Sequence, residues 1–117
     1  MYLLEDCSFV KDFASPVQKN KDIVEVLNKA AVVKVHSKTI DQFDTGDIDL
    51  LLLDCEGVEW FTLKRLISRP KLIIIETHVD DEYLNPYLNE ILLWMWKHDY
   101  YRAGRGKTDT LFINAKK

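Results

Sequence analysis

Two short apolar runs, each closed by an acidic residue, constrain the fold of this chain more than any other feature. Residues 50–53 are four leucines followed by Asp54, and residues 72–75 (Leu-Ile-Ile-Ile) are followed by Glu76. Continuous rather than alternating apolar character predicts strands that are covered on both faces, as parallel strands are. The residues between the runs form a stripe at helical spacing: Trp60, Leu63, Leu66 and Ile67. We therefore expect a strand, a crossover helix and a second, parallel strand, with the right-handed connection that such units almost always have.

The segments before this unit show other periods. Residues 1–20 are irregular, and residues 22–28 space their apolar side chains as a short helix does. Residues 31–40 alternate β-branched and polar side chains, which is typical of an extended segment with one solvated face.

The C-terminal part predicts a helix and a hairpin. Asn85 and Pro86 supply a capping residue and a first-turn proline for a helix that ends near Asp99. Its expected buried stripe is Leu88, Ile91, Leu92 and Met95. Residues 100–103 and 110–115 are extended runs separated by residues 104–107 (Gly-Arg-Gly-Lys), a pattern typical of an antiparallel hairpin. The expected fold is a single α/β domain over residues 1–117, with a mostly parallel sheet, flanking helices and a C-terminal antiparallel hairpin.

Charge, cysteines and hydropathy exclude several classes of function. The chain has 16 Lys and Arg against 19 Asp and Glu, a net charge of −3, so it lacks the basic excess that nucleic acid requires. Cys7 and Cys55 form no CxxC pair, which favours a reduced, cytoplasmic protein without a disulfide framework. The longest uncharged apolar run, residues 91–96, is far shorter than the ~18 residues of a membrane-spanning helix. We expect no nucleic-acid partner, no membrane partner and no secretory signal.

Acidic residues and one histidine follow the two predicted strands. In open α/β sheets, ligands bind outside the carboxyl ends of the parallel strands. The groups brought to that rim are Asp54, Glu56, Glu59, Glu76 and His78. Neighbouring carboxylates raise one another's proton affinity, which is a common way to produce a general base that works near neutral pH. We take Asp54, Glu56, Glu76 and His78 as the candidate catalytic residues.

Other interpretations of these residues stay open. Asp54 or Glu56 could instead cap the following helix, as acids at strand ends often do. A metal site with carboxylate ligands and His78 is less favoured, because no second histidine lies at a ligand spacing. His36 and His98 are expected at solvated positions. The aromatic residues around the last helix are expected in the core: Trp94, Trp96, Tyr100 and Tyr101.

Four blocks of this chain resemble the second half of the FkbM-type methyltransferases. Residues 39–43 (Thr-Ile-Asp-Gln-Phe) are similar to that family's threonine-containing segment, and residues 48–59 (Ile-Asp-Leu-Leu-Leu-Leu-Asp-Cys-Glu-Gly-Val-Glu) to its strand-to-helix signature. Residues 70–78 end in the Glu-x-His pattern of a later strand, and residues 109–112 are similar to the closing strand. Leu52 and Cys55 depart from the family's usual Lys and Val. The resemblance runs from about Ala31 to Ala115.

The resemblance implies an S-adenosylmethionine-dependent O-methyltransferase with a partial Rossmann-like sheet and a small hydroxyl-bearing acceptor. Such enzymes hold the cofactor with a glycine-rich loop after the first strand. The chain has four glycines and none lies in its first 45 residues, so we cannot assign cofactor-binding residues. Residues 104–106 match the G-x-G part of such a loop in sequence, but they lie in the expected hairpin and not between a strand and a helix.

Three readings of the chain follow, and one expectation about assembly. We favour the interpretation that it is the C-terminal portion of a methyltransferase. The alternatives are a non-catalytic interaction or assembly module derived from that fold and a small metal-dependent enzyme. Without the strand that precedes residues 50–53 in the complete fold, that run would have an unpaired apolar edge. Either residues 1–20 and 31–40 fold back over this edge, or two chains bury it against each other, and we expect the second arrangement, a twofold homodimer.

Overall fold

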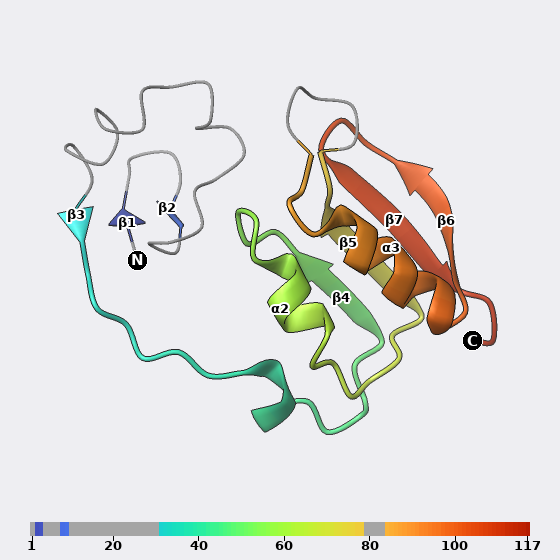
Figure 1. Ribbon diagram of the computed structural model, residues 1–117. Helices are drawn as coiled ribbons and strands as arrows, with labels where there is room; N and C mark the ends of the chain where they lie inside the picture. Colours follow the sequence, from blue (N-terminus) through green and yellow to red (C-terminus); the bar gives the residue numbers. More distant parts are fainter. Residues whose placement is uncertain (1, 4–7, 10–30, 79–83) are drawn as a thin grey trace.

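The computed structural model describes residues 2–3, 8–9, 31–78 and 84–117 of the chain. These residues form two sheets, a small one with strand order β2-β1-β3 and a four-stranded one with order β4-β5-β7-β6 (Figure 1). The small sheet comprises β1 (Tyr2–Leu3), β2 (Ser8–Phe9) and β3 (Ala31–Val32). The larger part comprises η2 (Ile40–Gln42), β4 (Leu50–Leu53), α2 (Glu59–Leu63), β5 (Leu72–Glu76), α3 (Leu88–Lys97), β6 (Tyr100–Arg105) and β7 (Asp109–Asn114).

The four-stranded sheet is mixed, which confirms the predicted sheet only in part. β4 and β5 are parallel, with Leu50 opposite Leu72 and Leu53 opposite Ile75. β7 is antiparallel to both of its neighbours, β5 and β6. Only one of the three strand pairs is therefore parallel, although β4, β5 and β6 run in the same direction. The reason is the tight hairpin, which folds β7 back into the space between β5 and β6.

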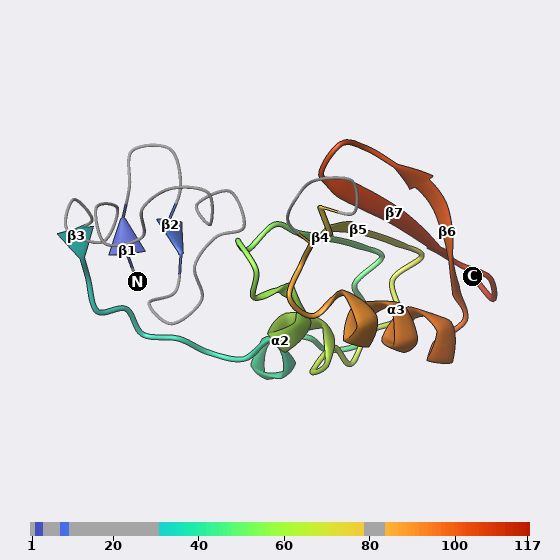
Figure 2. The same cartoon turned by 45° about the horizontal axis from the view of Figure 1, so that its top comes forward.

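Both helices cover the same face of this sheet (Figure 2). Burial alternates along β4 and β7, and on β5 Ile73 and Ile75 are buried while Leu72 and Ile74 are half-buried, as one covered face predicts. Glu76, at the end of β5, is also buried. The core therefore lies between the sheet and the helices. Its members are Leu51, Leu53, Leu63, Leu66, Ile73, Ile75, Ile91, Trp94, Met95, Tyr100 and Phe112. The expectation that β4 is covered on both faces is wrong for the described residues, since Leu50 and Leu52 are exposed.

The helix after β4 is shorter than its sequence pattern predicts. α2 ends at Leu63, and Ile67, predicted to belong to the helical stripe, is exposed. The buried carboxylate of Asp44 explains this end. It accepts hydrogen bonds from the backbone N–H groups of Ile67 and Ser68, each at 2.7 Å, and from the Ser68 hydroxyl. These bonds satisfy backbone donors that a longer helix would have paired internally.

The stripe and the aromatic residues of α3 also differ from expectation. Ile91 and Met95 are buried as predicted, but Trp94 takes the place expected for Leu92, which is exposed. Trp94 packs on Tyr100 with ring centroids 5.8 Å apart, and both are in the core. Trp96 and Tyr101, predicted to be core residues, are exposed. The helix turns Trp96 away from the sheet, and Tyr101 alternates with the buried Tyr100.

The predicted extended segment over residues 31–40 is strand only at β3, and residues 33–39 have no regular structure before η2 begins. The terminal hairpin is confirmed, and β6 extends two residues further than predicted, through Arg105, with an irregularity between Arg102 and Gly104. The short helix predicted at residues 22–28 lies outside the described residues, as does most of the segment 1–20. Within that segment, residues 2–3 and 8–9 pair as strands. No helix among the described residues is long and apolar enough to cross a membrane.

Candidate functional site

The carboxyl ends of β4 and β5 bring the predicted site residues to one rim. Because Leu53 lies opposite Ile75 in the parallel pair, Asp54 and Glu76 follow at matching positions of adjacent strands. Asp54 is exposed, Glu56 is half-buried, and Glu76 and His78 are buried. The negative charges of Asp54 and Glu56 both act on the Glu76 carboxyl, which places them within electrostatic reach. The predicted placement of these residues is therefore found, while their catalytic role stays a prediction.

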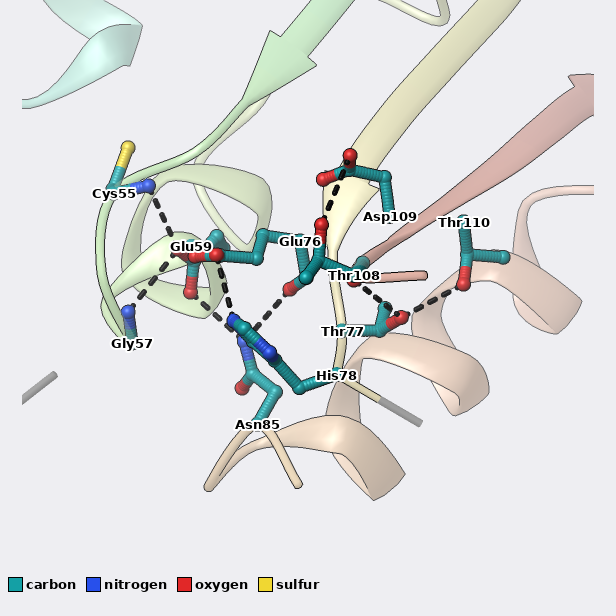
Figure 3. Close-up of polar contacts among 10 residues, drawn as sticks. All are labelled: Cys55, Gly57, Glu59, Glu76, Thr77, His78, Asn85, Thr108, Asp109 and Thr110. Atoms are coloured by element: carbon teal, nitrogen blue, oxygen red, sulfur yellow. Dashed lines mark hydrogen bonds and ion pairs between the residues drawn. The ribbon is translucent and has the colours of Figure 1, made fainter. Parts of the chain in front are cut away.

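A buried carboxyl–imidazole pair forms the centre of this rim (Figure 3). Glu76 Oε1 lies 2.7 Å from His78 Nε2, and the two side chains are 11% and 4% exposed. The other carboxyl oxygen, Glu76 Oε2, is buried and has no hydrogen-bond partner within the described part of the chain. A buried oxygen without a donor is costly, so this atom favours either its own proton or a donor from a bound molecule.

Burial raises the pKa of the Glu76 carboxyl to about 7. The charges of Asp54 and Glu56 act in the same direction, whereas the hydrogen bond and charge of His78 oppose the shift. Near neutral pH the carboxyl is thus poised between its acid and its base form. This is the property that a general base or acid needs at that pH.

The turn that carries His78 is fixed by backbone hydrogen bonds to the hairpin. The N–H groups of Thr77 and His78 both donate to the carbonyl of Thr108, at 2.8 and 2.9 Å. The Thr77 and Thr110 hydroxyls are 2.7 Å apart. Thr108 and Thr110 were not singled out in the sequence, because their role depends on β7 pairing with β5. The C-terminal hairpin therefore positions the histidine of the pair.

Glu59, which the sequence also places at the rim, is engaged in hydrogen bonds that hold the loop after β4. Its side chain is buried, and Oε1 accepts the backbone N–H groups of Cys55 and Gly57 at 2.8 and 3.1 Å. The capping role expected for Asp54 or Glu56 is not found, because the N-cap of α2 is Val58 and no side chain makes a capping hydrogen bond there. The N–H groups that Glu59 accepts belong to the loop before the helix. This carboxylate holds the loop between β4 and α2 in place.

Asn85 links the Glu59 side chain, near the end of β4, to the Glu76 backbone at the end of β5. Its amide nitrogen donates to Glu59 Oε2 at 2.8 Å and to the Glu76 carbonyl at 3.1 Å, and its amide oxygen accepts the Tyr87 N–H at 3.0 Å. The sequence predicts Asn85 as the helix-capping residue with Pro86 in the first turn, but α3 begins at Leu88 and its N-cap, Tyr87, has no side-chain capping bond. The bond from the Tyr87 N–H to Asn85 closes a turn that precedes the helix. The contacts of Asn85 with Glu59 and Glu76 have no signal in the sequence, since the partners are 26 and 9 residues away.

Two rim residues have a backbone conformation that only glycine adopts without cost. Glu56 has φ 55° and His78 has φ 49°. Such left-handed conformations in residues other than glycine cost on the order of 1 kcal/mol or more and are concentrated at functional sites. Both residues belong to the predicted site, and the hydrogen bonds that Glu59 Oε1 and the Thr108 carbonyl accept hold their loops. The fold therefore stabilises strained backbone where the candidate site lies.

Cys55 and possible metal ligands complete the description of the rim. Burial raises the pKa of the half-buried Cys55 thiol, and the charges of Glu59, Asp54 and Glu76 raise it further. The thiol is therefore protonated at neutral pH and is a poor nucleophile. Within the described ranges, no group of three or more His, Cys, Asp or Glu side chains is arranged to hold a metal ion.

The larger part of the structure is thus a small α/β domain: a sheet of order β4-β5-β7-β6 with a reversed β7, and acids at the carboxyl ends of its parallel strands. The family model described as "Methyltransferase FkbM domain" matches residues 4–101, and this chain belongs to that family. The match starts well before Ala31, where the resemblance in the sequence began, and it ends before β7. No curated protein and no solved structure matches the chain.

Membership of this family implies S-adenosylmethionine as the methyl donor. Gly57 is the one glycine among the described residues that lies between a strand and a helix, in the loop from β4 to α2. Its backbone N–H already donates to Glu59 Oε1. The N–H of Cys55 in the same loop is also engaged. The described residues therefore do not fit a complete site for this cofactor.

Proposed function

We propose that this chain carries the acceptor side of an S-adenosylmethionine-dependent O-methyltransferase, with the Glu76–His78 pair as its general base. The observation that carries the proposal is the buried Glu76 carboxyl, whose pKa is about 7 and whose Oε2 lacks a hydrogen-bond donor among the described residues. A hydroxyl group that reaches this oxygen supplies the missing donor. A methyl acceptor of the hydroxyl class therefore suits the pair.

The proton transfer that this pair supports is simple. The acceptor hydroxyl donates its proton to Glu76 Oε2 as its oxygen becomes nucleophilic, and the neutral carboxyl keeps its hydrogen bond to His78. His78 positions the Glu76 carboxyl, and its hydrogen bond stabilises the ionised form of that carboxyl. Asp54 is exposed, and its charge and that of Glu56 add to burial in keeping the pKa of Glu76 high.

A second part of the proposal is that this chain alone holds the cofactor only weakly. It is supported by the engaged N–H groups of the β4–α2 loop and by the absence of glycine from the first 45 residues. Calorimetric titration with S-adenosylmethionine tests it, and we expect millimolar or weaker affinity, about 4 kcal/mol or less. Binding in the low micromolar range would contradict this part.

Methyl transfer tests the general base. Labelled S-adenosylmethionine at millimolar concentration is incubated with the chain and a panel of small hydroxyl compounds between pH 5.5 and 9. We expect a rate that rises through about pH 7 and falls roughly 100-fold in Glu76→Gln, with little change in the matched variant Glu90→Gln on the exposed side of α3. Transfer that is independent of Glu76, or no transfer at all, would contradict the proposal.

A non-catalytic assembly module is the second candidate function. The observation that favours it is the exposure of Leu50 and Leu52, which leaves apolar surface on the sheet. If the chain transfers no methyl group at saturating cofactor but self-associates, this second function is supported instead of the first.

A further inference from the structure

Two buried threonines meet where β5 ends beside β7. Thr77 directly follows β5 and is 0% exposed, and Thr110 in β7 is 2% exposed. Their hydroxyl oxygens lie 2.7 Å apart, a normal length for a hydrogen bond between hydroxyl groups. The Thr77 hydroxyl also lies 3.5 Å from the carbonyl oxygen of Thr108, which is too long for a strong bond. The contact between the two hydroxyls is therefore the strongest polar interaction that either of them makes with a described residue.

His78, the residue after Thr77, leaves the regular strand. Its N–H and that of Thr77 both donate to the Thr108 carbonyl, whereas a carbonyl in a regular antiparallel ladder accepts from one N–H. The backbone of His78 is left-handed, with φ 49°. This turn carries the imidazole back to the Glu76 carboxyl, where Nε2 lies 2.7 Å from Oε1 (Figure 3). The position of the ring thus depends on where the backbone lies at Thr77.

Packing alone does not require hydroxyl groups at these two positions. Valine has nearly the shape of threonine and avoids the cost of removing a hydroxyl from water. Replacing both partners of a buried hydrogen bond by apolar groups of the same shape is often nearly neutral for stability. The hydrogen bond differs from an apolar contact in its direction, because it restricts both the distance and the angle between the two groups. It fixes the Thr77 side chain against β7, one residue before the turn.

We propose that Thr110 is a positioning residue for the Glu76–His78 pair. Its hydroxyl holds Thr77 in place, and Thr77 fixes the start of the turn that aims His78 at Glu76. The inference rests on the general-base function proposed above, in which His78 positions the carboxyl. Thr110 follows Thr77 by 33 residues and lies outside residues 4–101, the part of the chain that the family model matches. The family match therefore assigns Thr110 no role.

A displaced His78 ring has a measurable effect on the Glu76 carboxyl. The hydrogen bond and the charge of His78 lower the pKa of that carboxyl, against the effect of burial. Removing the threonine hydroxyls changes no charged group. The acidic residues carried by the surrounding elements stay as they are: Asp54 and Glu56 after β4, Glu59 of α2 and Asp109 of β7. A weaker contact with His78 should therefore raise the pKa of Glu76.

NMR titration of the full chain tests the proposal without any substrate. The carboxyl carbon of Glu76 and the ring of His78 are followed over the range in which both groups titrate, about pH 4 to 9. In Thr110→Val we expect the pKa of Glu76 to rise by about half a pH unit. Thr110→Ser, which keeps the hydroxyl, should stay near the wild type. Thr62→Val, a matched change at a half-buried position of α2, should do the same.

The double variant Thr77→Val/Thr110→Val separates positioning from stability. It leaves neither hydroxyl of the pair unpaired, so its free energy of unfolding, measured by urea denaturation, should stay close to that of the wild type. A raised pKa of Glu76 in this variant is then no consequence of partial unfolding. In methyl transfer, both valine variants should lower kcat at pH 6 about threefold with little change in KM, since half a pH unit corresponds to that factor in the ionised fraction.

The titration also defines the results that would overturn the inference. An unchanged pKa of Glu76 in both valine variants would do so, and so would a lowered pKa, which would show that water reaches the carboxyl instead. If Thr110→Ser behaves as Thr110→Val does, the hydroxyl is not the group that positions His78. A wild type that transfers no methyl group contradicts the proposed function, while the titration still decides whether Thr110 positions His78.

Discussion

Asn85 Nδ2 lies 2.8 Å from Glu59 Oε2, and this hydrogen bond joins the first turn of α2 to the segment that precedes α3. Both side chains belong to buried residues, and Glu59 also accepts the N–H groups of the loop that follows β4. The loops after β4 and β5 therefore share one hydrogen-bonded carboxylate. Because Asn85 also donates to the Glu76 carbonyl, the geometry of the candidate site depends on it.

Replacing Glu59 with glutamine should destabilise the protein strongly. Glutamine has the same shape as glutamate. Its amide nitrogen, however, would face an N–H donor that in the wild type binds a carboxylate oxygen of Glu59. We expect a loss of about 2 to 4 kcal/mol in the free energy of unfolding, measured by urea denaturation. Glu90→Gln, at an exposed position in the first turn of α3, should change it by less than about 0.5 kcal/mol. Equal effects of the two changes would contradict the role of Glu59.

The raised pKa of Glu76 predicts a specific dependence of stability on pH. The carboxyl has a higher pKa in the folded protein, about 7 against an ordinary value of 4.5. Its contribution is therefore fully present below about pH 4.5 and is lost as the pH rises through 7. The stability of the wild type relative to Glu76→Gln should fall by about 2 to 3 kcal/mol between pH 4 and 8. A difference that does not change over this range would show that the carboxyl titrates normally.

Asp44 predicts the opposite dependence at low pH. Burial alone would raise its pKa, but the hydrogen bonds from Ser68, Gly46 and Ile67 outweigh burial and lower it to about 2. Its stabilising contribution is thus present above about pH 3.8 and is lost as the pH falls towards 2. Asp44→Asn should lower the melting temperature at pH 7 and flatten the acid-induced loss between pH 4 and 2. Asp49→Asn, at an exposed position, serves as the control and should follow the wild type.

Asp99 ends α3 in a left-handed conformation, with φ 64°. Alanine tolerates this conformation poorly, whereas glycine and asparagine adopt it readily. We expect Asp99→Ala to lower the free energy of unfolding by about 1 kcal/mol, and Asp99→Gly and Asp99→Asn to stay within about 0.5 kcal/mol of the wild type. All three remove the exposed ion pair with Lys116, which contributes little. If Ala and Gly have the same effect in thermal unfolding, backbone conformation does not matter at this position.

Much of the larger part of the fold could be predicted from local patterns. The apolar runs before Asp54 and Glu76 predicted two parallel strands, and the glycine-containing turn between two extended runs predicted the hairpin. The face that α3 buries was predicted less well. Trp94 and not Leu92 enters the core, because helical spacing defines a stripe only approximately and packing against Tyr100 selects among its neighbours.

The sequence by itself determined which residues meet at the rim. Parallel strands bring their carboxyl ends together, so Asp54 and Glu76 had to be neighbours once both runs became strands. The tertiary structure alone decided what each of these residues can do. The turn that brings His78 to Glu76 is held by Thr108, and Glu59 is engaged by Asn85, 26 residues away. These partners are distant in sequence, and a pKa depends on that surrounding structure. The exposure of Leu52 was decided in the same way, because an apolar run specifies that a strand forms but not which of its faces another layer covers.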